Sequence, residues 1–245
     1  MIGGVCMAGN NAPRFDHCKD CPSQGQGIFC ELENLALNDL SRQKITNTFK
    51  KGQTLFVEGN PPYGLYCISK GNVKVTKMGA DGKDSIVRLV SAGDVLGHRS
   101  IFTEQFYSAT ATALEDTSVC FIDKKYIMKL VQSEPSVAQN LISRLGKDLG
   151  ASETKIASFS QRNVFERICE LLLLLKQSHG VEEDGKFRLD IKLTREEMAS
   201  LVGTATETLI RFLSELKEEK AIEQSGKTMY IVDEEKLLKF ANLSY

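Results

Sequence analysis

The stretch "LTREEMASLVGTATETLIRFLSELKEEKAIEQSGKTMYIVD", residues 193–233, decides the fold of the C-terminal part of the chain. It predicts a helix with Thr194 at its N-cap and Glu197 three residues on, the spacing of a capping box. A glycine-containing turn at residues 203–205 separates this helix from a second one, and a hairpin with its turn at residues 225–227 follows. Helix, short turn, helix and hairpin together predict a winged helix-turn-helix.

The second predicted helix is amphipathic, and its polar side suits DNA. A helix fits the major groove with its N-terminal residues nearest the base edges. Arg211 can make a bidentate contact with guanine, and Glu207 can accept from cytosine N4 or hold Arg211 in position. An exposed Glu–Arg pair worth about a few tenths of a kcal/mol is the alternative, but the surrounding pattern favours base contact. The predicted DNA-binding residues are Thr206, Glu207, Thr208, Ile210, Arg211 and Lys227.

Composition places the chain among globular proteins. It has 245 residues, of which 42% are hydrophobic, and no apolar run approaches the ~20 residues of a membrane span. The N-terminus lacks the pattern of a secretory signal, so we expect a cytoplasmic protein without a membrane partner. The net charge is −1, which argues against nonspecific coating of DNA but not against a site-specific contact.

Upstream of this region, residues 34–132 are expected to be β-rich. Short runs of β-branched and aromatic residues alternate with turn signals, which is typical of a small barrel or roll. Asp81-Gly82 is a candidate hairpin turn. Within the C-terminal part, "HGVEEDGKFRLDIKL", residues 179–193, predicts a loop followed by one strand.

A long helix is predicted over residues 135–159, with Pro135 in its first turn. Its apolar residues recur at helical spacing and form one stripe. Such a stripe can face the core of its own chain or a second copy of itself, and we favour a dimer. The stripe comprises Val137, Leu141, Leu145, Leu149, Ile156 and Phe159.

The whole order of parts resembles the Crp–Fnr transcription regulators, with the Fnr-like branch the closer one. The matching segments are "GDVLG" at residues 93–97, "RNVFERICELLLLL" at 162–175 and "VGTATETLIRFL" at 202–213. The resemblance implies an α+β fold: an N-terminal β-roll of the cyclic-nucleotide-binding type, a long dimerisation helix and a C-terminal winged helix-turn-helix. The corresponding domains are a Cys-rich N-terminal arm at 1–33, the roll at 34–132, the dimerisation helix at 133–160 and the DNA-binding domain at 161–245.

The resemblance also implies a function. Members of this family bind a palindromic operator as homodimers in response to a signal at the sensor domain, and they act with RNA polymerase. Their recognition helix uses a Glu and an Arg four residues apart to contact a TGA-type half-site core, and these residues are Glu207 and Arg211 here. Thr206 and Ile210 depart from the best-known branches, which leaves the outer bases of the half-site open.

The phosphate-binding cassette of the cyclic-AMP branch is altered in this chain. That branch has a Glu after "GD-x-x-G" and an Arg-Ser pair about ten residues later. Here His98 follows Gly97, and Tyr107-Ser108 occupies the Arg-Ser position. Both charged groups are missing, so cyclic AMP is disfavoured, whereas another small ligand stays open. The candidate ligand pocket comprises Gly97, His98, Arg99, Ser100, Tyr107 and Ser108.

The chain has seven cysteines, an odd number that argues against a disulfide framework. Cys18, Cys21 and Cys30 form C-x2-C-x8-C, and Cys120 matches the fourth ligand of the oxygen-labile [4Fe–4S] cluster in the Fnr branch. These four thiols could hold such a cluster or zinc, serve thiol redox chemistry, or hold no cofactor at all. Cys67 and Cys169 lie in apolar runs and fit the role of small hydrophobic residues.

Function of another class has to be weighed as well. A cyclic-nucleotide-type sensory module could act through protein contacts rather than DNA, and the near-neutral charge of the C-terminal part favours it slightly. No Ser–His–Asp grouping, P-loop or H-E-x-x-H motif is present. The sequence therefore predicts a regulator and not an enzyme.

Overall fold

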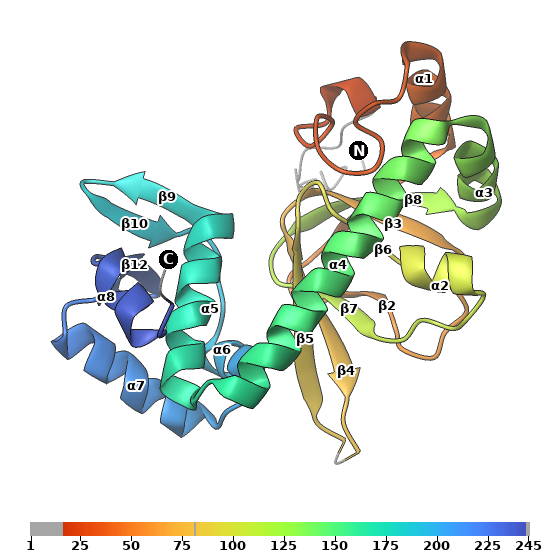
Figure 1. The fold of residues 1–245 in the computed structure, drawn as a ribbon. Coiled ribbons are helices and arrows are strands. Elements are labelled where there is room, and N and C mark those ends of the chain that lie inside the picture. The colour runs from red at the N-terminus through yellow and green to blue at the C-terminus, as the bar shows by residue number, and fades with distance from the viewer. Residues whose placement is uncertain (1–16, 81, 244–245) are drawn as a thin grey trace, which may run out of the picture. The chain divides into compact units, whose positions relative to one another are not determined.

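The computed structural model describes residues 17–80 and 82–243. The chain divides into two compact units, one formed by residues 1–73 and 90–142 and the other by residues 74–89 and 143–245. The structure thus has an N-terminal β-roll, a long helix and a C-terminal helix-turn-helix domain, as the sequence predicts (Figure 1). The domain boundaries drawn from the sequence stay a prediction.

Two four-stranded sheets form the β-roll, with the orders β1-β8-β3-β6 and β2-β7-β4-β5. The neighbouring strands β4 and β5 confirm the predicted hairpin; Gly82 there has φ +76°, and Asp81 lies outside the described residues. The strands are β1 (Ile45–Phe49), β2 (Thr54–Phe56), β3 (Gly64–Lys70), β4 (Asn72–Met78), β5 (Asp84–Ser91), β6 (Val95–Leu96), β7 (Thr110–Ala113) and β8 (Thr117–Asp123).

The expectation of a β-rich region missed the helices that lie within it. These are α1 (Asn34–Gln43), α2 (His98–Thr103) and α3 (Lys124–Ser133), and a single 3-10 turn η1 (Cys18–Asp20) precedes them. Each is short and buries few apolar side chains, such as Leu37 and Leu40 in α1. A helix with so few apolar residues gives only a weak periodic signal.

The long helix α4 (Pro135–Gln161) begins at the predicted proline. Its predicted stripe divides in two: Val137 and Leu141 are buried in the core of the first unit, whereas Ile142, Leu149 and Ile156 have exposed fractions of 69%, 61% and 69%. The expectation of one continuous apolar stripe therefore needs correction, because its first residues belong to the core of their own chain.

The second unit contains α5 (Val164–His179), β9 (Gly180–Glu183), β10 (Lys186–Leu189), α6 (Arg195–Val202), α7 (Thr206–Glu218), β11 (Ile222–Ser225), β12 (Thr228–Ile231) and α8 (Glu234–Phe240). Its sheet has the order β11-β12-β10-β9. The prediction of a loop plus one strand before α6 was wrong, since β9 and β10 pair as a hairpin. All four residues of β9 are exposed, so this strand has no alternating pattern that could reveal it.

Local signals fix the helix starts of this unit. Thr194 and Glu197 form the predicted capping box at α6, and Asn163 and Glu166 form a second one at α5. Buried side chains of α5, α6, α7, β12 and α8 share one core. Among the described residues, no helix is both long enough and apolar enough to cross a membrane.

Candidate functional site

The turn between α6 and α7 requires glycine. Gly203 has φ +71° and ends α6, and its N–H donates to backbone carbonyls of that helix. A Cβ at this position would lie 2.5 Å from a ring carbon of Phe159. The guanidinium of Arg167 donates to the carbonyl of Val202 over 3.0 Å and satisfies one of the last carbonyls of α6. The two helices are thus held at a fixed, short turn.

Helix α7 presents its polar side outward. Leu209, Leu213 and Leu216 are buried, while Glu207 and Arg211 are exposed. Within the part of the chain that the structure describes, no ion pair joins Glu207 to Arg211. The Arg211 guanidinium lies 4.7 Å from the centroid of the Phe212 ring. Both side chains are therefore presented to solvent, not committed to each other.

The other predicted DNA-binding residues surround this pair. Ile210 is 48% exposed, and Thr206 and Thr208 are half-buried near the start of α7. Lys227 is exposed in the turn between β11 and β12, the position of a wing. These residues lie on the recognition helix and on the hairpin that follows it in the same unit.

Aromatic side chains fill the interior of the roll where the altered cassette ends. The ring of Tyr107 stacks on Phe56 with centroids 4.1 Å apart, and its hydroxyl donates to the Gly64 carbonyl over 3.2 Å. Burial raises the pKa of Tyr107 far above its usual value, so the phenol stays neutral. A neutral, buried phenol cannot replace the arginine that binds a cyclic phosphate.

The remaining residues of the candidate ligand pocket point to different environments. His98 and Ser100 are buried in α2, whereas Arg99 is exposed. The Ser100 hydroxyl donates to the backbone carbonyl of Phe106 over 3.2 Å. The structure thus places the only arginine of this set on the surface, away from the buried Tyr107.

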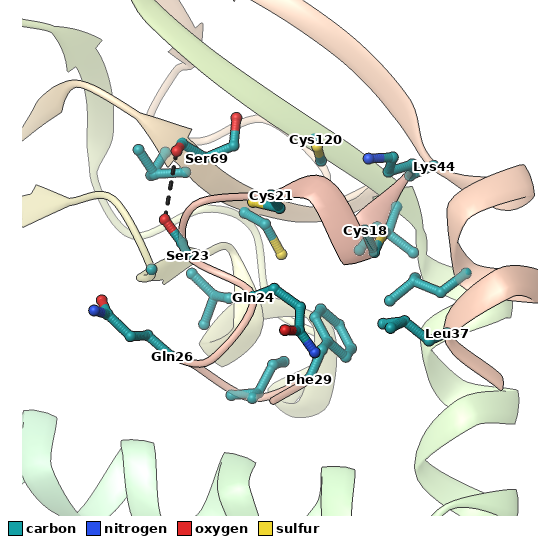
Figure 2. Close-up of a pocket in the computed structure, with 17 residues that line it drawn as sticks. Cys18, Cys21, Ser23, Gln24, Gln26, Phe29, Leu37, Lys44, Ser69 and Cys120 are labelled. Atoms are coloured by element: carbon teal, nitrogen blue, oxygen red, sulfur yellow. Dashed lines mark hydrogen bonds between the residues drawn. The ribbon is translucent and has the colours of Figure 1, made fainter. Parts of the chain in front are cut away.

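A cavity of about 70 Å³ lies in the first unit under the Cys18–Asp20 turn. We call it the cysteine pocket. Figure 2 shows Cys18, Cys21 and Cys120 around it together with Lys44. Its remaining walls are mainly apolar, for example Leu37 on α1.

The fourth cysteine of this pocket is Cys67, which the sequence assigned to the apolar core. Cys67 lies directly opposite Cys120 in the β3–β8 pair. Cys30, the predicted ligand, does not line the pocket; its sulfur lies 3.8 Å from the Asn140 side-chain nitrogen. Residues 17–80 and 82–243 contain no set of three or more His, Cys, Asp or Glu side chains already arranged to hold a metal ion.

Burial dominates the ionisation of the two strand cysteines. It raises the pKa of Cys67 well above its usual value, and the neighbouring cysteines raise it further while Lys44 opposes them. It also raises the pKa of Cys120, against the effect of Lys44 and of a contact with the Thr46 hydroxyl. The sulfur of Cys120 and that hydroxyl are 3.8 Å apart. Both thiols are therefore neutral unless a cation compensates their charge.

A β-roll followed by a long helix and a helix-turn-helix with an exposed Glu–Arg surface defines a DNA-binding regulator with a sensor domain. Residues 46–134 match the family model of the cyclic nucleotide-binding domain, and residues 166–240 match that of the Crp-like helix-turn-helix domain. The chain is 30% identical over 215 residues to the CRP-like cAMP-activated global transcriptional regulator of Mycobacterium tuberculosis, covering 88% of this chain and 96% of that protein.

Further similarity comes from the other branch and from solved structures. The transcriptional activator protein FnrL of Cereibacter sphaeroides is 27% identical, with 92% of each chain covered. The fold resembles that of FixK2 from Bradyrhizobium japonicum, with a TM-score of 0.73 at 22% identity over 82% of this chain and 99% of that one. The chain belongs to the Crp–Fnr family of DNA-binding transcription regulators.

Proposed function

We propose that the protein binds a palindromic operator as a homodimer and that a signal at its sensor domain controls this binding. The observation that carries the proposal is the exposed pair Glu207 and Arg211 on the outer side of α7. Their spacing places both side chains on one helix face near its N-terminal end, which is the end that approaches base edges in helix-turn-helix proteins. Lys227 on the hairpin would contact the phosphate backbone.

The exposed part of the α4 stripe supports the homodimer. Ile142, Leu149 and Ile156 recur every seven residues, the period of a coiled-coil seam. Three large apolar side chains in a row on one helix are a costly surface for a monomer in water. A second copy of the same helix would bury them, and a two-fold dimer would match a palindromic site with half-sites one helical turn apart.

Arginine 211 provides the test of base contact. The probe is a duplex with two inverted TGA half-sites, compared with a duplex in which both TGA triplets are scrambled. Arg211→Ala should lose about 1–3 kcal/mol per half-site and most of its preference for the TGA duplex. Lys239→Ala removes the same charge from the exposed side of α8 and should change affinity little. Equal binding by Arg211→Ala and the parent would refute the role.

The signal remains a proposal of its own. The relative from Mycobacterium tuberculosis is described as cAMP-activated, but here Tyr107 occupies the interior of the roll and Arg99 is exposed. We therefore propose that cyclic AMP does not control this protein. A [4Fe–4S] cluster, zinc or thiol redox chemistry at the cysteines is one class of alternatives, and the absence of any cofactor is another.

A second candidate function is a sensory module that acts through protein contacts. From Lys186 onward the chain has 10 basic and 11 acidic side chains, which is unusual for a DNA-binding domain. Salt distinguishes the two functions: a DNA-binding protein loses affinity steeply with rising salt, whereas an adaptor shows no specific duplex binding. Under the first function we propose RNA polymerase as a partner, a cytoplasmic location, no membrane partner and no enzymatic activity.

A further inference from the structure

The cysteine pocket brings together thiols from three distant segments. Cys18 and Cys21 come from the turn around η1, Cys67 from the middle of β3 and Cys120 from β8. Two of them are adjacent in the chain and two are cross-strand neighbours. The four thiols therefore form two pairs that meet at one cavity.

The pleat of the sheet explains why Cys67 belongs to this set. Alternate residues of a strand point to opposite faces, and directly opposed residues on paired strands share a face. Leu65 and Ile122 are opposed like Cys67 and Cys120, and both lie in the core beneath α1. The intervening Tyr66 lies on the other face, where its ring is 5.1 Å from that of Phe121. Cys67 must then face the pocket.

The C-x2-C pair is held over the same cavity by local hydrogen bonds. The backbone N–H of Cys18 donates to the Ser41 hydroxyl on α1 over 2.9 Å. The Ser23 hydroxyl donates to the Ser69 carbonyl on β3 over 3.4 Å (Figure 2). These two contacts bracket Cys18 and Cys21 and keep their side chains at the pocket.

We propose that Cys18, Cys21, Cys67 and Cys120 form a four-thiolate site for a thiophilic metal centre, and that Cys30 lies outside it. Four thiolates satisfy tetrahedral zinc and equally an iron–sulfur cluster, so the shared chemistry is soft, all-sulfur ligation. Lys44 lines the same pocket and offsets part of the negative charge that four thiolates bring. The apolar walls exclude water, which favours sulfur over oxygen ligands.

Ligation must move the N-terminal turn. The four thiols line the cavity, yet no three of them among the described residues are already spaced as ligands. Strands β3 and β8 are fixed in a paired sheet, whereas η1 is a single turn of three residues. The metal would therefore draw Cys18 and Cys21 towards Cys67 and Cys120. Metal binding in this way orders the segment next to α1 and links the pocket to the sensor domain.

This inference rests on the proposed function only in assigning the signal, because metal retention is measured without DNA. The full chain is loaded under reducing conditions with Zn²⁺ alone, and separately without oxygen with Fe²⁺, sulfide and a thiol reductant. Metal and sulfide per chain, visible absorption and competition with a chelator are then recorded. Zinc or an iron–sulfur cluster is identified by the arm in which the parent retains its metal.

The matched variants are Cys67→Ser, Cys30→Ser and Cys169→Ser, the last in the core of the second unit. Losing even an outer-shell partner costs about 10–100-fold in metal affinity. We therefore expect Cys67→Ser to weaken retention at least about tenfold, with Cys30→Ser and Cys169→Ser equal to the parent. Parent-like retention by Cys67→Ser, loss in Cys30→Ser, or a parent that holds metal in neither arm overturns the proposal.

A measurement on the parent protects the test against misfolding of a variant. Alkylation rates of individual cysteines are compared by mass spectrometry with metal bound and after chelation. Metal should slow the reaction at Cys18, Cys21, Cys67 and Cys120 and leave Cys30 unchanged. Slowing at Cys30 without slowing at Cys67 contradicts the assignment. DNA binding is assayed separately, so a failure of the proposed function leaves this result interpretable.

Discussion

The recognition helix and the cysteine pocket are built from interactions of different range. All of α7 lies within Thr206–Glu218, and the turn before it depends on one glycine. The pocket combines residues from η1, β3 and β8, which are far apart in sequence. Local spacing is therefore enough to define the first surface, whereas the second exists only once two strands have paired in the correct register.

This difference has a consequence for function. The DNA-binding surface is carried by a helix with a fully buried inner face and a fixed turn, so its residues are already presented. The pocket lies between a rigid sheet and a single 3-10 turn. A sensor needs such a partly movable side, since a signal can only act by favouring one of two arrangements.

The largest expected effect tests the rigid side of this comparison. Leu209 is fully buried on the inner face of α7 and its neighbour Ile210 is 48% exposed. Leu209→Ala should lower the free energy of unfolding by about 2–5 kcal/mol because it leaves a cavity. Ile210→Ala should stay within about 0.5 kcal/mol. Urea denaturation followed by circular dichroism measures both, and equal losses would mean that α7 does not pack this way.

A smaller effect is expected at the turn before α7. Gly203→Ala must place a side chain at φ +71° and against the Phe159 ring, which should cost about 1–3 kcal/mol. Gly226 also has a positive φ, +58°, but has open space around its Cα. Gly226→Ala should therefore cost only the backbone strain of about 1–2 kcal/mol. A larger loss for Gly226→Ala, measured by the same denaturation, would show that the ring contact is unimportant.

Much of the fold was predictable because its signals are local. The capping box at Thr194, the helix start at Pro135 and the glycine turn are each visible within a few residues of sequence. Strand β9 could not be predicted, since all of its residues are exposed. The split of the α4 stripe was equally invisible, because periodicity does not show which apolar residues pack against their own chain.

The candidate sites show the same limit. Glu207 and Arg211 could be placed on one helix face from their spacing alone, although only the structure shows that no ion pair joins them. Cys67 could not be assigned, because its role depends on its register opposite Cys120. The alternation in "GLYCISK" carried part of the signal, since it sets Leu65 and Cys67 on one face. Which cysteine lies across that face is a nonlocal fact.

The cap of α6 gives an intermediate test of how far local signals fix the recognition unit. The Thr194 hydroxyl accepts from the Glu197 N–H over 3.1 Å. Thr194→Ala should cost about 0.5–2 kcal/mol of stability, visible as a lower urea midpoint. Thr154→Ala removes a hydroxyl that donates only to the carbonyl one turn back on α4 and should have little effect. Equal effects would remove the capping box as a determinant of this fold.

The smallest effect concerns the movable side of the pocket. Ser41→Ala removes the acceptor of the Cys18 N–H, a hydrogen bond worth about 0.5–1.5 kcal/mol. Global stability should hardly change, but the Cys18 amide should exchange with solvent roughly threefold to tenfold faster, because the loss acts on a local opening. Ser152→Ala, whose hydroxyl donates only within α4, should leave that rate unaltered. If Ser41→Ala instead leaves the Cys18 rate unchanged while Thr194→Ala destabilises α6, the turn is held by its packing against the strands, and the pocket is as rigid as the recognition helix.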